Sequence, residues 1–155
     1  MNIRLAQLED APHLNNLLRD LEFFSYFNEE DPVTSIARIK QYLHQCLTQD
    51  SHSIYLVETD AVLVGYTAVQ WLTYLFLPGP EGYVTELFIR SDYRGQGLGS
   101  QLLAAVEAEA KRRGCARLAL INNNTRESYQ REFYKKQSWQ ERQQMVNFIK
   151  ILVED

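Results

Sequence analysis

One stretch of the sequence decides the fold: residues 86–99, which read ELFIRSDYRGQGLG. An apolar strand pattern ends at Ile89, three glycines alternate at Gly95, Gly97 and Gly99, and an amphipathic helix begins among them. Glycine permits positive φ and places no Cβ between the backbone amides and a ligand. A helix N-terminus adds unpaired N–H groups and about half a positive charge. The stretch therefore predicts a backbone site for a phosphate or a pyrophosphate.

Two common glycine motifs do not fit this turn. A dinucleotide-binding motif would need a third glycine at position 100, which is Ser100, and would expect an early strand–helix–strand unit. A phosphate-binding P-loop would need a lysine followed by serine or threonine, and the turn contains no lysine. The pattern that remains is Arg94-x-x-Gly97-x-Gly99. The alternative interpretation is a turn that only tightens a helix start, and the leading arginine and following amphipathic helix disfavour it.

The flanking segments predict an alternation of strands and helices. Apolar residues at helical spacing indicate a first helix through Leu14 and Leu21 and a second through Ile36 and Leu47, which Thr34 or Ser35 would cap. A turn at 59–61 joins two strands into an antiparallel hairpin, whereas strands on either side of the helix 97–113 should be parallel. The other predicted elements are strands at 2–7, 53–57, 62–75, 83–89 and 116–121, a fourth helix at 126–136, and two final strands, the last at Met145–Val153.

Composition excludes several classes of protein. The chain has 155 residues with 16 basic and 20 acidic side chains, a net charge of −4 that offers no basic surface to nucleic acid. No apolar run approaches the roughly 20 residues that span a bilayer, and the N-terminus lacks the apolar core of a signal peptide, so we expect no membrane association and a cytoplasmic location. Its two cysteines and three histidines lack metal-ligand spacing, and we therefore expect no metal.

The Arg94-x-x-Gly97-x-Gly99 pattern resembles the signature of the GNAT superfamily of acyl-CoA-dependent N-acyltransferases, Gln/Arg-x-x-Gly-x-Gly/Ala. The order of the predicted elements and the run 132–136, EFYKK, match the family as well. The resemblance covers the whole chain. It implies an α/β (α+β) fold in a single N-acetyltransferase domain at 1–155. It also implies a mixed central sheet of about six to seven strands, splayed between the fourth and fifth strands, with four helices.

The resemblance implies acetyl-CoA as the cosubstrate. Backbone amides from Arg94 through Ser100 would hold the pyrophosphate, with the Arg94 side chain helping. Backbone groups of Phe88 and Ile89, on the strand before the turn, would pair with the pantetheine arm, which needs no special side chain. Asn124 follows the fifth strand, where the family often has an asparagine that contacts the cofactor. Its spacing from Tyr134, which lies near the end of the predicted fourth helix, departs from the family pattern. The predicted cofactor-binding residues are Leu87, Phe88, Ile89, Arg94, Gly95, Gln96, Gly97, Leu98, Gly99, Ser100 and Asn124.

The resemblance also implies direct attack of a primary amine on the thioester, without a covalent enzyme intermediate. Tyr134 matches the family position for the acid that protonates the departing thiolate. Glu86, directly before the pantetheine-pairing run, is the candidate base or amine-orienting group, acting directly or through water. Glu81 and Glu58 are weaker substitutes. The alternatives are a core aromatic at 134 and a solvent-facing or arginine-paired carboxylate at 86.

The acceptor is predicted only as a class: a small-molecule amine or a peptide amine of the lysine or N-terminal type. Aromatic residues at 23–27 and the acidic run 29–31 would suit a cationic amine, although they also fit a solvated loop beside core aromatics. A non-catalytic acyl-CoA-binding sensor or regulatory module is the alternative function. Dimers are frequent in the family, so a homodimer stays open as an assembly.

Overall fold

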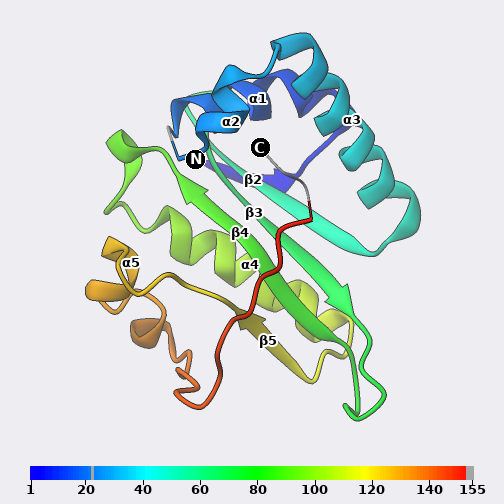
Figure 1. Ribbon diagram of the computed structural model, residues 1–155, viewed down its shortest axis with the longest axis vertical. Coiled ribbons are helices and arrows are strands. Elements are labelled where there is room, and N and C mark those ends of the chain that lie inside the picture. The colour runs from blue at the N-terminus through cyan, green and yellow to red at the C-terminus, as the bar shows by residue number, and fades with distance from the viewer. Residues whose placement is uncertain (22, 153–155) are drawn as a thin grey trace. The chain divides into compact units, whose positions relative to one another are not determined.

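The computed structural model describes residues 1–21 and 23–152, which divide into two compact units at 1–121 and 122–155. The first unit contains one five-stranded sheet in the order β1-β2-β3-β4-β5 (Figure 1). Its strands are β1 (Asn2–Leu5), β2 (His52–Thr59), β3 (Val62–Leu72), β4 (Glu81–Ile89) and β5 (Arg117–Leu120). The first four strands pair antiparallel and β5 pairs parallel with β4, which confirms the predicted mixed sheet.

Helices cover both faces of the sheet. The first unit holds α1 (Ala11–Asp20), α2 (Ser25–Glu29), α3 (Pro32–Gln49) and α4 (Leu98–Arg112). Helices α1 and α3 pack on one face, and α4 packs on the other against β2, β3 and β4 (Figure 1). The short helix α2 was not predicted, because its five residues bury no side chain and carry no amphipathic pattern.

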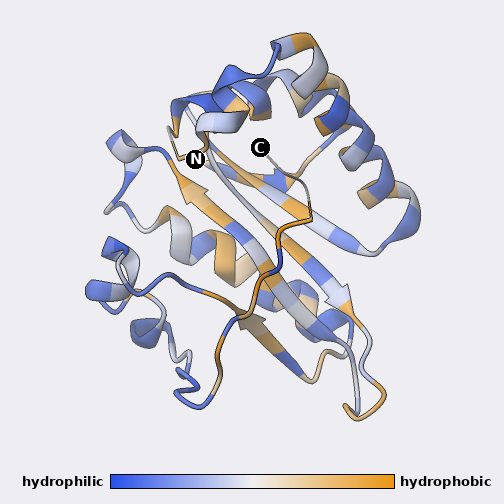
Figure 2. Ribbon diagram, viewed as in Figure 1, coloured by the Kyte–Doolittle hydropathy of each residue, from blue (hydrophilic) through white to orange (hydrophobic). Residues whose placement is uncertain are grey.

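The two faces have separate apolar cores, because strand side chains alternate between faces. Figure 2 shows apolar residues along the central strands and polar residues along the exposed side of α3. The core under α1 and α3 is made by buried residues of those helices and of β2 and β3: Leu14, Leu17, Leu43, Leu56 and Tyr66. The core under α4 is made by Val57, Val64, Leu98 and Leu102.

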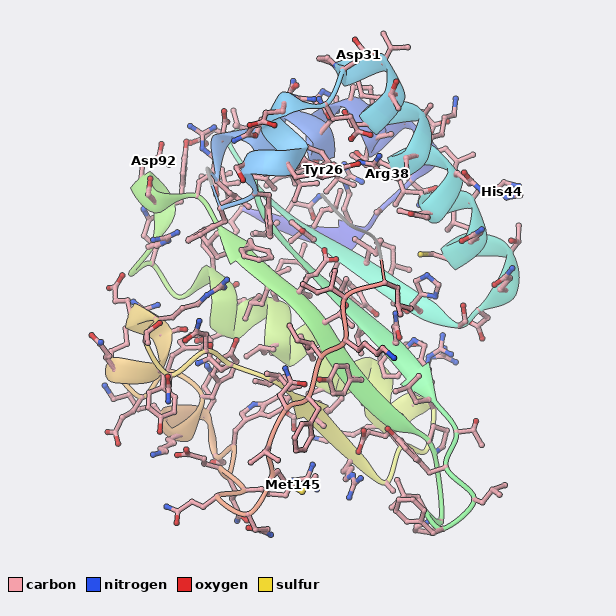
Figure 3. All side chains as sticks on the ribbon, in the orientation of Figure 1. Tyr26, Asp31, Arg38, His44, Asp92 and Met145 are labelled. Atoms are coloured by element: carbon pink, nitrogen blue, oxygen red, sulfur yellow. The ribbon has the colours of Figure 1, made fainter. Side chains whose placement is uncertain are left out.

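Helix α3 begins earlier than the sequence predicts. Pro32 occupies its first turn, and the Asp31 carboxylate accepts hydrogen bonds from the Thr34 N–H (3.1 Å) and hydroxyl (3.3 Å), so Asp31 is the N-cap in place of Thr34 or Ser35 (Figure 3). Ser35 is instead fully buried and donates its hydroxyl to Asn15 Oδ1 at 2.6 Å, which ties α3 to α1.

Replacing Asp31 by alanine should lower the free energy of unfolding by about 1 kcal/mol, because the capping acceptor is lost. Urea denaturation checks this through the midpoint of the transition. Thr34→Ala is the matched control, since it keeps the capped N–H and removes only the weaker hydroxyl contact. A loss as large in Thr34→Ala as in Asp31→Ala would show that Asp31 is not the cap.

The second unit, residues 122–155, departs most from the expected pattern. Its helix α5 spans only Glu127–Gln130, and a short 3₁₀ turn follows at Lys135–Gln137. The predicted helix at 126–136 is interrupted because Glu132 adopts φ 57°, in the left-handed region. Ser138 also has positive φ (66°), and the chain turns there after the 3₁₀ segment.

The predicted counts of strands and helices are wrong. Within residues 1–21 and 23–152 the structure has five strands and five α-helices, not six to seven strands and four helices. Residues 139–152 form no strand, although Met145 begins an apolar alternating run; the last residue of that predicted strand, Val153, lies outside the described residues. Alternation supplies a face for burial, but a strand also requires a neighbouring strand to accept its hydrogen bonds.

Candidate functional site

Over half of its length, the outer edge of β4 has no strand partner among residues 1–21 and 23–152, and we call this stretch the open edge. The parallel pairing with β5 runs only from Glu81–Arg117 to Val84–Leu120, so residues 85–89 lie beyond the end of β5. At the same point β4 has a bulge: Ala68 on β3 faces Glu86 and Val69 faces Val84, which leaves Thr85 as the extra residue. The pairing of β4 with β5 therefore ends at Val84 and Leu120, one residue before the bulge.

Backbone groups of β4 point into this opening at alternate residues. The Arg90 N–H donates to the Val64 carbonyl at 2.9 Å and therefore faces β3. By alternation, the backbone groups of Ile89 and Leu87 face the open side, whereas those of Phe88 face β3. The Ile89 carbonyl accepts a hydrogen bond from Arg94 Nε (3.1 Å), which draws the Arg94 side chain across the start of the turn.

The turn after β4 presents uncapped amides. It passes through a 3₁₀ turn at Ser91–Tyr93, where Figure 3 labels Asp92, and then through Gly95 (φ 75°) and Gly97 (φ 78°) to the first residue of α4. Gly97 is the N-cap of α4 and gives no side-chain cap, and the first helical bond runs from the Gln101 N–H to its carbonyl (3.1 Å). The amides of residues 98–100 therefore lack an acceptor within the helix.

Space beside this turn is open on the side of the glycines. A Cβ built at Gly95 or Gly97 would meet no atom within 4 Å. The structure thus brings the open edge of β4, the Arg94 side chain and the N-terminus of α4 to one place. Donors arranged in this way suit a ligand that has a polar arm and an anionic group, because the arm can pair with the strand while the anion meets the amides.

Glu86 is the carboxylate nearest to the start of this open edge. It follows the bulge directly, its side chain is exposed, and it lies on the face of the sheet that α1 and α3 cover. The two weaker candidates for a base are already paired: Glu81 is buried against Arg117, and Glu58 bonds to Arg4 at 2.6 Å. Among the three carboxylates, Glu86 is the one placed at the opening.

Aromatic side chains from the segment before α2 surround Phe88 on the same face as Glu86. The rings of Phe23 and Phe24 lie 6.0 Å and 5.6 Å from the Phe88 ring, centroid to centroid. The acidic run 29–31 offers less unpaired negative charge than its sequence indicates, because two of its three carboxylates have partners. Glu30 pairs with Arg38, whose hydrogen bonds lower the pKa of that carboxyl, and Asp31 is committed to the cap of α3 (Figure 3).

Tyr134 and Asn124 lie in the second unit. The Tyr134 ring packs edge-on against Phe133 (4.9 Å) and Trp139 (6.0 Å), and its burial raises the pKa of the hydroxyl, against a smaller lowering effect of Arg126. Asn124 is exposed, and its neighbour Asn123 makes the local turn by accepting from the Thr125 N–H and hydroxyl.

Metal ligation and membrane crossing were also considered for the described residues. In residues 1–21 and 23–152, no three histidine, cysteine or acidic side chains gather in a way that could hold a metal ion. Over the same residues, none of the helices combines the length and apolar character that a bilayer crossing requires.

A family model and a related sequence both match acetyltransferases. The sequence model of the Acetyltransferase (GNAT) family matches residues 14–139. An acetyltransferase of Agrobacterium fabrum is 38% identical over 140 residues, which cover 88% of this chain and 85% of that protein.

Solved structures share the fold at low sequence identity. An aminoglycoside acetyltransferase from an uncultured soil metagenomic sample, in complex with sisomicin, superposes with a TM-score of 0.78 at 18% identity, covering 98% of this chain and 96% of that one. A predicted acetyltransferase from Clostridium acetobutylicum, with acetyl-CoA, gives a TM-score of 0.70 at 20% identity, covering 96% and 95%.

Proposed function

Because this chain belongs to the GNAT acetyltransferase family, whose enzymes take acetyl groups from acetyl-CoA, we propose that it transfers an acetyl group to a primary amine by direct attack in a ternary complex. The observation that carries the proposal is the open edge of β4 beside the uncapped N-terminus of α4. The acceptor is a small-molecule or peptide amine. We also propose that residues 1–155 act as one N-acetyltransferase domain.

Acetyl-CoA would be held mainly by backbone groups. The pyrophosphate meets the amides of residues 94–100 and the positive end of the α4 dipole, with the Arg94 side chain alongside. The pantetheine amides pair with Leu87 and Ile89, whose backbone groups face the opening left by β5. Open space beside Gly95 and Gly97 supports this assignment, since a Cβ there would occupy the volume that the phosphates need. Asn124 is kept as a proposed contact.

The chemistry has two proton transfers. A primary ammonium with a pKa of about 10 is only about one-thousandth neutral at pH 7, a cost of about 4 kcal/mol that a carboxylate can offset by accepting the proton. Glu86 takes this proton. The amine nitrogen then bonds to the carbonyl carbon of the thioester, the C–S bond breaks, and the thiolate leaves with the electron pair. Tyr134 donates its hydroxyl proton to that thiolate.

A panel of amines tests the proposal. Polyamines, aminoglycosides and lysine-like amines are incubated with the protein and acetyl-CoA, release of the thiol is followed, and the acetylated product is identified by mass. We expect at least one primary amine to turn over. If calorimetry shows that acetyl-CoA binds but no amine turns over, the proposed enzymatic function is wrong and the alternative, a non-catalytic acyl-CoA sensor, is favoured.

A further inference from the structure

A tyrosine on β3 has its hydroxyl in the core. Tyr66 is 4% exposed and packs among apolar residues of α1, α3 and β2, with its ring 5.9 Å from that of Phe88. A phenol hydroxyl in such a place needs a hydrogen-bond partner, because a buried polar group that is left unpaired destabilises the fold. The identity of that partner therefore matters for what the residue does.

The strand register places Glu86 beside this hydroxyl. Tyr66 faces Phe88 and Ala68 faces Glu86 without a bulge between them, so Tyr66 and Glu86 are diagonal neighbours on one face of the sheet. At this spacing the Tyr66 hydroxyl is within reach of the Glu86 carboxylate, which acts on the phenol through its charge and as a side-chain hydrogen-bond partner. Burial, and then the Glu86 charge and this hydrogen bond, raise the pKa of Tyr66 well above its usual value, so the phenol remains the donor.

The backbone of Glu86 is fixed independently of Tyr66. Thr67, fully buried on β3, donates its hydroxyl to the Glu86 carbonyl at 2.9 Å. At the bulge itself, the Thr85 hydroxyl donates to the Ala68 carbonyl at 3.3 Å. With the main chain held at both points, the remaining freedom is in the side-chain torsions of an exposed glutamate, and the Tyr66 hydroxyl lies where it can restrain them.

We propose that Tyr66 is a positioning residue: it holds the Glu86 carboxylate at the open edge of β4, in the orientation in which it accepts the proton of the acceptor amine. This inference rests on the proposed function, because it requires Glu86 to act as the base. Restraint of the carboxylate matters for rate, since proton transfer requires hydrogen-bond reach and a misplacement of about 1 Å can cost a large part of catalysis.

A double-mutant cycle tests the proposal. Tyr66→Phe, Glu86→Gln and the double variant are compared for kcat and for the KM of acetyl-CoA, using acetyl-CoA with the panel amine that turns over fastest. Tyr66→Phe should lower kcat about tenfold without changing the KM of acetyl-CoA, since general-base catalysis contributes about 100-fold or more and displacement removes part of it. In the Glu86→Gln background the same substitution should change kcat less than twofold, because Tyr66 then has no base to position.

Tyr55→Phe is the matched control. Tyr55 lies on β2 on the opposite face of the sheet, where burial raises the pKa of its hydroxyl, and its loss should leave kcat unchanged. Urea midpoints of all variants show whether any of them loses the fold. Full kcat in Tyr66→Phe, or equal losses from it in both backgrounds, would overturn the positioning role while Glu86 remains the base. Full kcat in Glu86→Gln would instead remove the base assignment of the proposed function, and the inference with it.

Discussion

Replacing Tyr134 by phenylalanine is expected to lower kcat by about 100-fold, the usual contribution of a positioned general acid. The phenylalanine ring keeps the contacts with Phe133 and Trp139, so the local packing survives and only the proton donor is removed. Without it, the coenzyme A thiolate leaves as an unprotonated anion. Steady-state kinetics with the fastest panel amine measure the effect, and the KM of acetyl-CoA should change less than the kcat.

The pH dependence of this acid follows from its environment. Burial raises the pKa of Tyr134 from its ordinary value of about 10, and Arg126 opposes that shift only in part. The hydroxyl is therefore protonated throughout the neutral and mildly alkaline range, and it loses its proton only as the pH passes above about 10. No decrease of kcat below that pH should arise from Tyr134.

Tyr129→Phe is the matched control in the same unit. The Tyr129 hydroxyl donates to Glu141 Oε1 at 2.8 Å on the surface, so its removal should cost little kcat and little stability. If Tyr134→Phe keeps the wild-type kcat, or if Tyr129→Phe falls as far, Tyr134 is not the acid and the thiolate is protonated by another group or by water.

Elements bounded by local signals are those that the sequence predicts best. Helix α4 was expected at 97–113 and spans Leu98–Arg112, because Gly97 and Gly114 both have positive φ and mark its two ends. The hairpin of β2 and β3 follows from the turn at 59–61 in the same way, with Asp60 and Ala61 in the left-handed region. Each of these signals acts within a few residues of the element that it ends.

Elements that depend on distant partners could not be predicted. The alternation after Met145 is a sound strand pattern, yet nothing in that pattern specifies which strand would pair with it. The left-handed conformation of Glu132 interrupts a helix whose residues are otherwise compatible with one, and glutamate gives no local signal for such a break. The cap of α3 is a different case: Asp31 precedes the predicted caps by three and four residues, and Pro32 was a local signal that could have identified it.

The candidate site likewise has one part that local sequence features predict and one part that they do not. Its backbone part at residues 94–100 was predictable, because glycines and a helix start are local features. The pairing of Tyr66 with Glu86 was not, because it depends on the register between β3 and β4, which the sequence of either strand alone does not specify. A shift of that register by one residue would turn Glu86 to the other face of the sheet, out of reach of Tyr66, since such a shift reverses every side chain.

Replacing Gly97 by valine should weaken acetyl-CoA binding by about 100-fold, because two charge-assisted amide bonds to the pyrophosphate would be lost at about 1.5 kcal/mol each. The new side chain meets no protein atom within 4 Å and projects into the space assigned to the phosphates. The positive φ of 78° adds backbone strain of about 2 kcal/mol for a residue with a Cβ. Calorimetric titration with acetyl-CoA measures the affinity, and urea denaturation measures the strain.

Gly114→Val separates these two effects. Gly114 has φ 68°, its added Cβ also meets nothing within 4 Å, and it lies just beyond the C-terminal end of α4. Both variants should lose similar stability, but only Gly97→Val should lose affinity, because the amides that bind the pyrophosphate lie at the N-terminal end alone. Equal affinity losses would mean that strain rather than contact is responsible. Undiminished affinity in a folded Gly97→Val variant would place the pyrophosphate away from this turn, since no cosubstrate could occupy the volume of the new side chain and still keep its bonds to the amides.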